Sequence, residues 1–132
     1  MGVVVDTSVW SLALRRGTPP EDPQVGKFSA ILNEGGDVVL LGVVLQEVLQ
    51  GIRRRADFDK VRSHLEAFPL LSLERDDYVM AAELRNLCVA RGINVGTIDC
   101  QIAAACVRHG HALLTRDQDF QLIASVCELR LL

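Results

Sequence analysis

The sequence predicts an α/β domain built on a parallel sheet, because short apolar runs alternate along it with longer segments of helical pattern. The apolar runs are hydrophobic at consecutive positions rather than at every second one. This is typical of strands whose two faces are both covered by helices. A length of 132 residues, without a repeat or a long linker, indicates one domain over residues 1–132.

Five strands and seven helices are expected along the chain. The strands are the apolar runs at residues 2–5, 38–41, 69–73, 112–115 and 129–132. The helices are the segments at residues 9–14, 23–34, 43–51, 55–67, 75–91, 98–109 and 120–124. In open parallel sheets, functional sites form beyond the carboxyl ends of the strands.

Local signals support these elements in turn. After the first helix, Gly-Thr-Pro-Pro at residues 17–20 interrupts the chain, as glycine and proline do in loops. The helix at 43–51 carries an apolar stripe at helical spacing, whereas the helix at 55–67 is highly charged. A loop at 92–96 precedes the helix at 98–109, and His109-Gly110-His111 is typical of a turn from that helix into the fourth strand.

The composition indicates a folded protein. Hydrophobic residues make up 49% of the sequence and the mean hydropathy is +0.23, so a packed core is available and disorder is not expected. A net charge of -3 and a pI near 5.5 do not suggest a non-specific nucleic-acid binder. Local basic patches would still allow an acidic protein to bind nucleic acid.

Neither a targeting segment nor a metal motif based on cysteine is visible. Residues 1–6 lack the basic leader and apolar core of a secretory signal, and the longest apolar stretch, 38–45, is far shorter than the ~20 residues that span a bilayer. We therefore expect a soluble cytoplasmic protein without membrane contact. The four cysteines form no Cys-x-x-Cys pair and the three histidines lack ligand spacing, so we interpret the cysteines as buried reduced thiols.

Five carboxylates are expected to meet at one edge of the sheet. Asp6 follows the first strand, Glu47 lies on the helix after the second, Asp99 lies on the helix at 98–109, and Asp117 and Asp119 follow the fourth strand. Two unit charges about 4 Å apart repel by roughly 4 kcal/mol at an effective dielectric near 20. Such a cluster needs protons, basic partners or a cation, and oxygen-rich acidic sites suit Mg²⁺ or Mn²⁺.

Most of these acids also have a purely structural explanation. Asp6 and Asp117 could cap the helices that follow them, Asp119 could be a turn residue, and Glu47 could be a solvated helix residue. Asp99 is the exception. Its position in the first helical turn is favourable, but helical spacing places it on the apolar face of its helix, where an unpaired charge costs several kcal/mol.

Four short motifs match a known family in order and together cover essentially the whole chain. They are VVDTSVW at residues 4–10, EVLQG at 47–51, GTID at 96–99 and TRDQDF at 115–120. With them the sequence resembles the PIN-domain ribonucleases, in particular the VapC-like toxins of toxin–antitoxin pairs. The resemblance implies a homodimer and a three-layer α/β/α sandwich with a central, mostly parallel five-stranded sheet.

The resemblance also implies a function. It implies endonucleolytic cleavage of RNA with one or two Mg²⁺ or Mn²⁺ ions, and inhibition by a cognate antitoxin. By motif position, Asp6, Asp99 and Asp117 would bind the metal, with Glu47 in the same catalytic set. The supporting positions would be Asp119 and the hydroxyls of Ser8 and Thr115, which would orient carboxylates.

Arginines near the acidic motifs have two interpretations. They are Arg15, Arg16, Arg53, Arg54, Arg55 and Arg116. At the rim of an acidic pocket they would grip RNA phosphates. Alternatively, those that follow the first and third helices are solvated and complement the helix dipole, and Arg116 pairs with a carboxylate.

Two other functions are compatible with part of the pattern. A haloacid-dehalogenase-like phosphatase would use Asp6 as a nucleophile. Such enzymes carry a D-x-D motif after the first strand, where this chain has Ser8 in place of the second aspartate, and they need a lysine late in the chain. The chain has only Lys27 and Lys60, which also argues against a response-regulator receiver. The other alternative is an inactive PIN-like module that binds RNA or protein, against which the intact acids argue.

Overall fold

The computed structural model describes residues 2–15 and 21–132, so the predicted RNA contact at Arg16 lies outside the described residues. Over the described part, the chain forms four strands and seven helices. None of these helices is long and apolar enough to cross a membrane. In chain order the elements are β1 (Val3–Val5), α1 (Thr7–Ala13), α2 (Pro23–Asn33), β2 (Val38–Leu41), α3 (Gly42–Gln50), α4 (Arg55–Leu65), β3 (Leu70–Leu71), α5 (Arg75–Ala90), α6 (Thr97–His109), β4 (Ala112–Leu114) and α7 (Asp119–Ala124).

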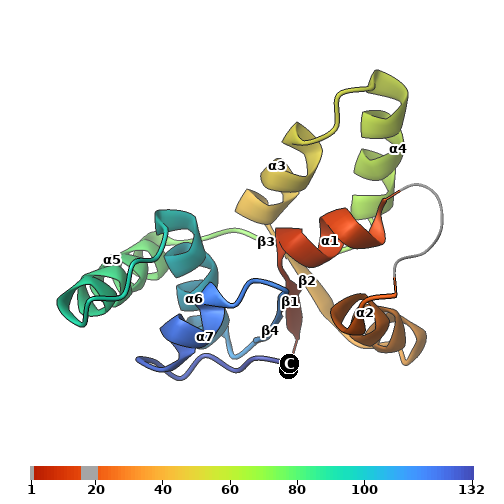
Figure 1. The fold of residues 1–132 in the computed structure, drawn as a ribbon. Coiled ribbons are helices and arrows are strands. Elements are labelled where there is room, and N and C mark those ends of the chain that lie inside the picture. Colours follow the sequence, from red (N-terminus) through yellow and green to blue (C-terminus); the bar gives the residue numbers. More distant parts are fainter. Residues whose placement is uncertain (1, 16–20) are drawn as a thin grey trace.

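The four strands form one parallel sheet in the order β3-β2-β1-β4. In β1, Val3 pairs with Val38 of β2 on one side and with Ala112 of β4 on the other. Helices α5, α6 and α7 lie on one side of the sheet, and α1, α2 and α4 lie on the other (Figure 1). The predicted α/β class, with a parallel sheet between helical layers, is confirmed.

The expected fifth strand at residues 129–132 is wrong. In the described part of the chain this segment makes one isolated parallel bridge, between Leu131 and Leu113 of β4. Leu113 donates to the carbonyl of Arg130 at 2.8 Å and accepts from the amide of Leu132 at 3.0 Å, whereas its two neighbours in β4 bond on the β1 side. Because β4 has three residues, only one of them directs its backbone N–H and C=O away from β1. A ladder of hydrogen bonds to residues 129–132 therefore cannot extend beyond this one residue. The third strand is also shorter than the expected 69–73.

Helix α6 lies at the centre of its layer because its buried side chains are small. Ala103, Ala104 and Ala105 are all 0% exposed, as is Ile102 before them. Successive residues point about 100° apart around a helix, so burial of a continuous run means that the helix is covered on all sides. Methyl groups allow close approach to the neighbouring elements, which fixes the first turn of α6, including Asp99, relative to the sheet.

The four cysteines are free thiols, and Cys88, Cys100 and Cys106 are buried. Burial raises the pKa of Cys100 to about 11 and that of Cys106 to about 12. Both therefore stay protonated at neutral pH. Three of the four cysteines are thus buried, as expected from the sequence, whereas Cys127 is only partly buried.

A fully buried carboxylate, Asp77, joins α5 to α6. Its Oδ1 accepts a hydrogen bond from Arg108 Nη1 at 2.7 Å and lies 3.0 Å from His109 Nε2, while the side chain is 0% exposed. Its Oδ2 accepts from the backbone N–H of Glu74 at 2.7 Å, in a capping box that starts α5. Burial acts to raise the pKa of Asp77, but these donors hold it below its ordinary value.

Asp77→Ala should lower the free energy of unfolding by about 2–3 kcal/mol, because it leaves a half-buried Arg108 and the Glu74 amide without their acceptor. The wild-type carboxylate stabilises the fold above its ordinary pKa of 3.8, and this stability is lost as the pH falls through the lowered folded-state pKa. The difference in free energy of unfolding between variant and wild type should therefore be largest at pH 7 and should decrease in strong acid. Urea unfolding followed by circular dichroism measures it.

Asp76→Ala is the matched control for this prediction. The Asp76 carboxylate is 76% exposed and lies 3.9 Å from Arg108 Nη2. Its removal should change stability by less than about 0.5 kcal/mol. Equal losses in the two variants would contradict a role for the buried carboxylate.

Candidate functional site

The carboxyl ends of β1 and β4 lie next to each other and create the site. Val5, the last residue of β1, pairs with Leu114, the last residue of β4. The amide of Asp6 then donates to the carbonyl of Leu114 at 2.9 Å, so Asp6 and Thr115 leave the sheet side by side. Strand β1 has β2 on one side and β4 on the other, and this reversal of strand order is the usual location of a ligand site in open parallel sheets.

Asp6 is held in place by two hydroxyl groups. Its Oδ2 accepts hydrogen bonds from Ser8 Oγ at 2.9 Å and from Thr115 Oγ1 at 2.8 Å, and the residue is 7% exposed. Thr115 Oγ1 also accepts from the amide of Asp117 at 3.0 Å. Ser8 Oγ accepts from the amide of Arg116 at 3.1 Å. The hydroxyls expected to orient carboxylates therefore connect β1 with the loop after β4.

Three of the predicted acids converge on one point. Asp99, Asp117 and Asp119 each offer a carboxylate oxygen, and these oxygens all lie within 4.8 Å of one another. Asp99 comes from the first turn of α6, and Asp119 starts α7. The amide of Asp119 donates to Asp117 Oδ1 at 2.9 Å, which orients that carboxylate from within the loop. Asp6, predicted with Asp99 and Asp117, lies outside this close group.

The other four acids nevertheless all act electrostatically on Asp99. The pKa of Asp99 is raised from its ordinary 3.8 to about 6, first by burial and then by the charges of Asp117, Asp6, Asp119 and Glu47. Glu47, on α3, accepts a hydrogen bond from Thr7 Oγ1 at 3.0 Å. The donor set is made entirely of carboxylate oxygens, which suits a hard divalent cation.

Arg116 pairs with a carboxylate, as one of the two interpretations of the arginines expected. Arg116 Nε donates to Asp22 Oδ2 at 2.8 Å, so its carboxylate partner is on α2 rather than among the five acids. Arg54, which precedes α4, pairs with Asp57 in the first turn of that helix at 3.8 Å. The side chains of Arg15 and Arg53 are exposed.

Two residues that contact the site were missed by sequence reasoning. Gln24 Nε2 donates to the carbonyl of Thr115 at 2.8 Å, and Asp22 pairs with Arg116 as described. The Asp22-Pro23 pair does carry a signal, because it is typical of a helix start. Nothing local in the sequence connects that start with the loop after β4.

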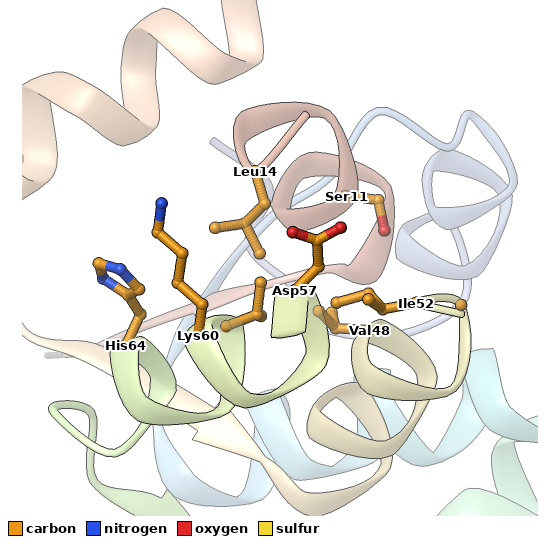
Figure 2. A pocket seen from close by; sticks show the side chains of 9 residues that line it. Ser11, Leu14, Val48, Ile52, Asp57, Lys60 and His64 are labelled. Atoms are coloured by element: carbon orange, nitrogen blue, oxygen red, sulfur yellow. The ribbon is translucent and has the colours of Figure 1, made fainter. Parts of the chain in front are cut away.

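A hollow of about 400 Å³ lies apart from the acids, between α1, α3 and α4. Its apolar wall includes Leu14, Val48 and Ile52. Figure 2 shows Lys60 and His64 on successive turns of α4, with Leu14 of α1 across from them. None of the five acids lines this hollow. It was not predicted from the sequence.

Comparison with known proteins assigns the chain to a protein family. The model of the family described as "PIN domain" matches residues 3–126. The chain belongs to the PIN-domain family. This match contains every acidic motif described above, from Asp6 to Asp119.

The PIN domain is also similar to individual proteins over almost its full length. It is 25% identical over 130 residues to VapC ribonuclease Mb1587 of Mycobacterium bovis and to ribonuclease VapC11 of Mycobacterium tuberculosis, covering 97% of this chain and 96% of each relative. Among solved structures, VapBC2 of Rickettsia felis bound to a promoter DNA fragment matches with a TM-score of 0.80 at 17% identity, covering 100% of this chain and 98% of that one. VapC20 of Mycobacterium tuberculosis, described as a sarcin-ricin loop cleaving toxin, matches with a TM-score of 0.66 at 19% identity, covering 91% and 93%.

Asp99→Asn should stabilise the metal-free protein by about 1 kcal/mol at pH 7.5, a value discounted for partial solvent exposure. Because the folded-state pKa of about 6 lies above the ordinary 3.8, the native state retains a proton that the unfolded chain loses. Wild-type stability should therefore fall as the pH rises from about 4 to about 6, and the variant should lose this dependence on residue 99. Urea unfolding in the presence of EDTA at several pH values measures both.

Glu83→Gln is the matched control, because Glu83 is an exposed acid in the middle of α5. It should leave the pH dependence unchanged. A loss of several kcal/mol in metal-free Asp99→Asn would mean that Asp99 is a structural partner, contrary to the prediction.

Proposed function

We propose that this PIN domain is a divalent-metal-dependent endoribonuclease toxin that hydrolyses RNA phosphodiester bonds and is neutralised by a cognate antitoxin. The observation that carries the proposal is the convergence of the Asp99, Asp117 and Asp119 oxygens beyond the carboxyl ends of β1 and β4. The ribonuclease relatives, which match nearly the whole chain, support the same reaction class.

The residues proposed to hold the metal are Asp99 and Asp117, whose oxygens converge with that of Asp119, and Asp6, which lies outside this close group but acts electrostatically on Asp99. One oxygen of Asp6 is occupied by the hydroxyls of Ser8 and Thr115, which leaves the other oxygen to face a cation. The chemistry supplied by one or two bound Mg²⁺ or Mn²⁺ ions is acidification of the attacking water and neutralisation of charge on the scissile phosphate.

Glu47 is proposed to orient or deprotonate that water. Its Oε1 accepts from Thr7 Oγ1, which fixes the carboxylate on the β1 side of the site while α3 supplies the backbone. A positioned carboxylate of this kind accelerates proton transfer by about 10²- to 10⁴-fold. Because water attacks in line, we expect products that end in 5′-phosphate and 3′-hydroxyl.

The alternatives receive less support. A phosphatase of the haloacid-dehalogenase type would need a lysine beside Asp6, but Lys27 is on α2 and Lys60 is on α4, where it lines the separate hollow. An inactive module would have no need to gather like charges that raise the pKa of Asp99.

We further propose RNA contacts through Arg15, Arg53 and Arg54, and a homodimer. For the dimer, the exposed apolar residues of α5, among them Tyr78, Val79 and Val89, are the proposed contact.

The antitoxin is proposed to dock in the hollow between α1, α3 and α4. Its apolar wall fits an amphipathic segment, whose acidic side chain would face Lys60 and His64 rather than Asp57, an acid that also lines the hollow. One of the structural relatives is described as a toxin–antitoxin complex from Klebsiella pneumoniae, which supports an antitoxin partner.

Purified protein should cleave RNA only when Mg²⁺ or Mn²⁺ is added, and EDTA should stop the reaction. Asp6→Asn should reduce the rate by about a hundredfold or more, because it removes a proposed ligand while Ser8 and Thr115 can still bond to the amide. Cleavage of a labelled RNA, with mapping of the 5′ and 3′ ends, is the measurement.

Asp37→Asn is the control, since this exposed acid precedes β2 at the opposite end of the sheet. Cleavage that leaves 2′,3′-cyclic phosphate would exclude the water-attack mechanism. Phosphatase activity without RNA cleavage, measured in parallel, would favour the Asp6-nucleophile alternative.

Lys60→Glu should weaken inhibition by the cognate antitoxin several-fold, and more strongly at low salt, because it reverses a charge at the rim of the hollow. Lys27→Glu, at the only other lysine of the chain, provides a matched charge reversal on α2. Titration of the antitoxin against RNA cleavage measures the effect. Equal inhibition of the two variants would contradict docking in the hollow.

A further inference from the structure

The two acids Asp117 and Asp119 depend on a short loop for their position. Strand β4 ends at Leu114 and α7 begins at Asp119, so residues 115–118 form the whole connection. The inner side of this loop is bonded to β1 and α1 through the hydroxyls of Thr115 and Ser8. These bonds hold one side only, whereas a loop that presents charged ligands must be fixed against movement in both directions.

The first turn of α2 holds the outer side of the same loop. Gln24 Nε2 donates to the carbonyl of Thr115 at 2.8 Å and lies 3.2 Å from the carbonyl of Leu132. Asp22 Oδ2 accepts from Arg116 Nε at 2.8 Å. Contacts from α2 therefore reach both residues that immediately precede Asp117.

Asp22 has two tasks, one for each carboxylate oxygen. Its Oδ1 accepts from the amides of Gln24 at 3.0 Å and Val25 at 3.1 Å, and this caps the N-terminus of α2. Its Oδ2 is left for Arg116. The same carboxylate therefore starts the helix and connects it to the loop, so the orientation of α2 and the position of the loop are fixed together.

A surface ion pair could also be without function, since exposed pairs contribute little to stability. The Arg116 side chain is 42% exposed and that of Asp22 is 15% exposed. The position of the contacts argues for more than this. They act on the backbone of Thr115 and on the side chain of Arg116, so any displacement of α2 moves Asp117 relative to Asp99 on α6, which is held independently by its own packing.

We infer that Asp22 and Gln24 are positioning residues that hold the loop at residues 115–118 from outside, so that the oxygens of Asp117 and Asp119 stay in reach of Asp99. This inference rests on the proposed function, because the three acids are its proposed metal site. The expected consequence of losing either contact is weaker binding of the divalent ion, with the fold retained.

Binding of Mn²⁺ alone, without RNA, is the direct test, and the free ion is quantified by electron paramagnetic resonance. Gln24→Leu has similar size but cannot donate to Thr115, and it should weaken Mn²⁺ binding by about tenfold. Asp22→Asn keeps an oxygen that caps α2 but loses the charge that faces Arg116, and it should weaken binding by a smaller factor. Lys27→Leu, an exposed position on the same helix, is the control and should bind as wild type does.

The dependence of RNA cleavage on Mn²⁺ concentration separates positioning from general damage to the fold. A positioning role shifts the half-saturating Mn²⁺ concentration upward while the rate at saturation largely recovers. A merely structural role lowers the rate at saturation without this shift. If Gln24→Leu fails to fold by circular dichroism, Asp22→Asn carries the test because its helix cap is kept.

A double-mutant cycle then asks whether Asp22 acts through Arg116. Asp22→Asn, Arg116→Gln and the double variant should weaken Mn²⁺ binding to the same extent, because the two side chains form one contact. Wild-type Mn²⁺ affinity in both Gln24→Leu and Asp22→Asn, with cleavage intact, would overturn the inference alone. A wild-type protein that neither binds Mn²⁺ nor cleaves RNA would overturn the proposed function and the inference with it.

Discussion

The pairing of β1 with β4 is the constraint on which the site depends. Because Val5 lies opposite Leu114, the chain delivers Asp6 and Thr115 to the same point from segments more than a hundred residues apart. All residues of β1 and β4 except Val3 are buried, so a change in the register of these strands would disturb the packing of their apolar side chains. Sheet register therefore holds in place a group of like charges that repel one another.

The repulsion between these carboxylates is reduced locally by hydrogen-bond donors rather than by basic side chains. Hydroxyl groups bond to Asp6 and Glu47, and a backbone amide bonds to Asp117. Arg116, the cation nearest in sequence, is drawn away to Asp22. Burial, followed by the remaining negative charge, raises the pKa of Asp99, and this charge keeps the centre of the site attractive to a small cation.

The sequence was informative wherever a local pattern decides the structure. Continuous apolar runs located β1, β2 and β4, and the apolar face of its helix singled out Asp99. The segment at 129–132 has the same apolar pattern, but a three-residue β4 presents only Leu113 to it, and no pattern reports the length of a partner strand. Gln24 and Thr115 are 91 positions apart, so their contact exists only after the sheet has formed. That Asp119, rather than Asp6, lies closest to Asp99 and Asp117 was not predicted for a similar reason, since distances between carboxylates depend on loop conformation.

The enclosed alanines of α6 have a consequence for how this fold can vary. The thickness of the layer between Asp99 and the strands is set there by single methyl groups, with no exposed side on which a larger group could turn outward. A branched or aromatic side chain would act as a spacer, lifting the whole helix and carrying its carboxylate out of range of the opposite loop. The geometry of the acids is thus encoded partly in residues that have no polar atom in their side chains.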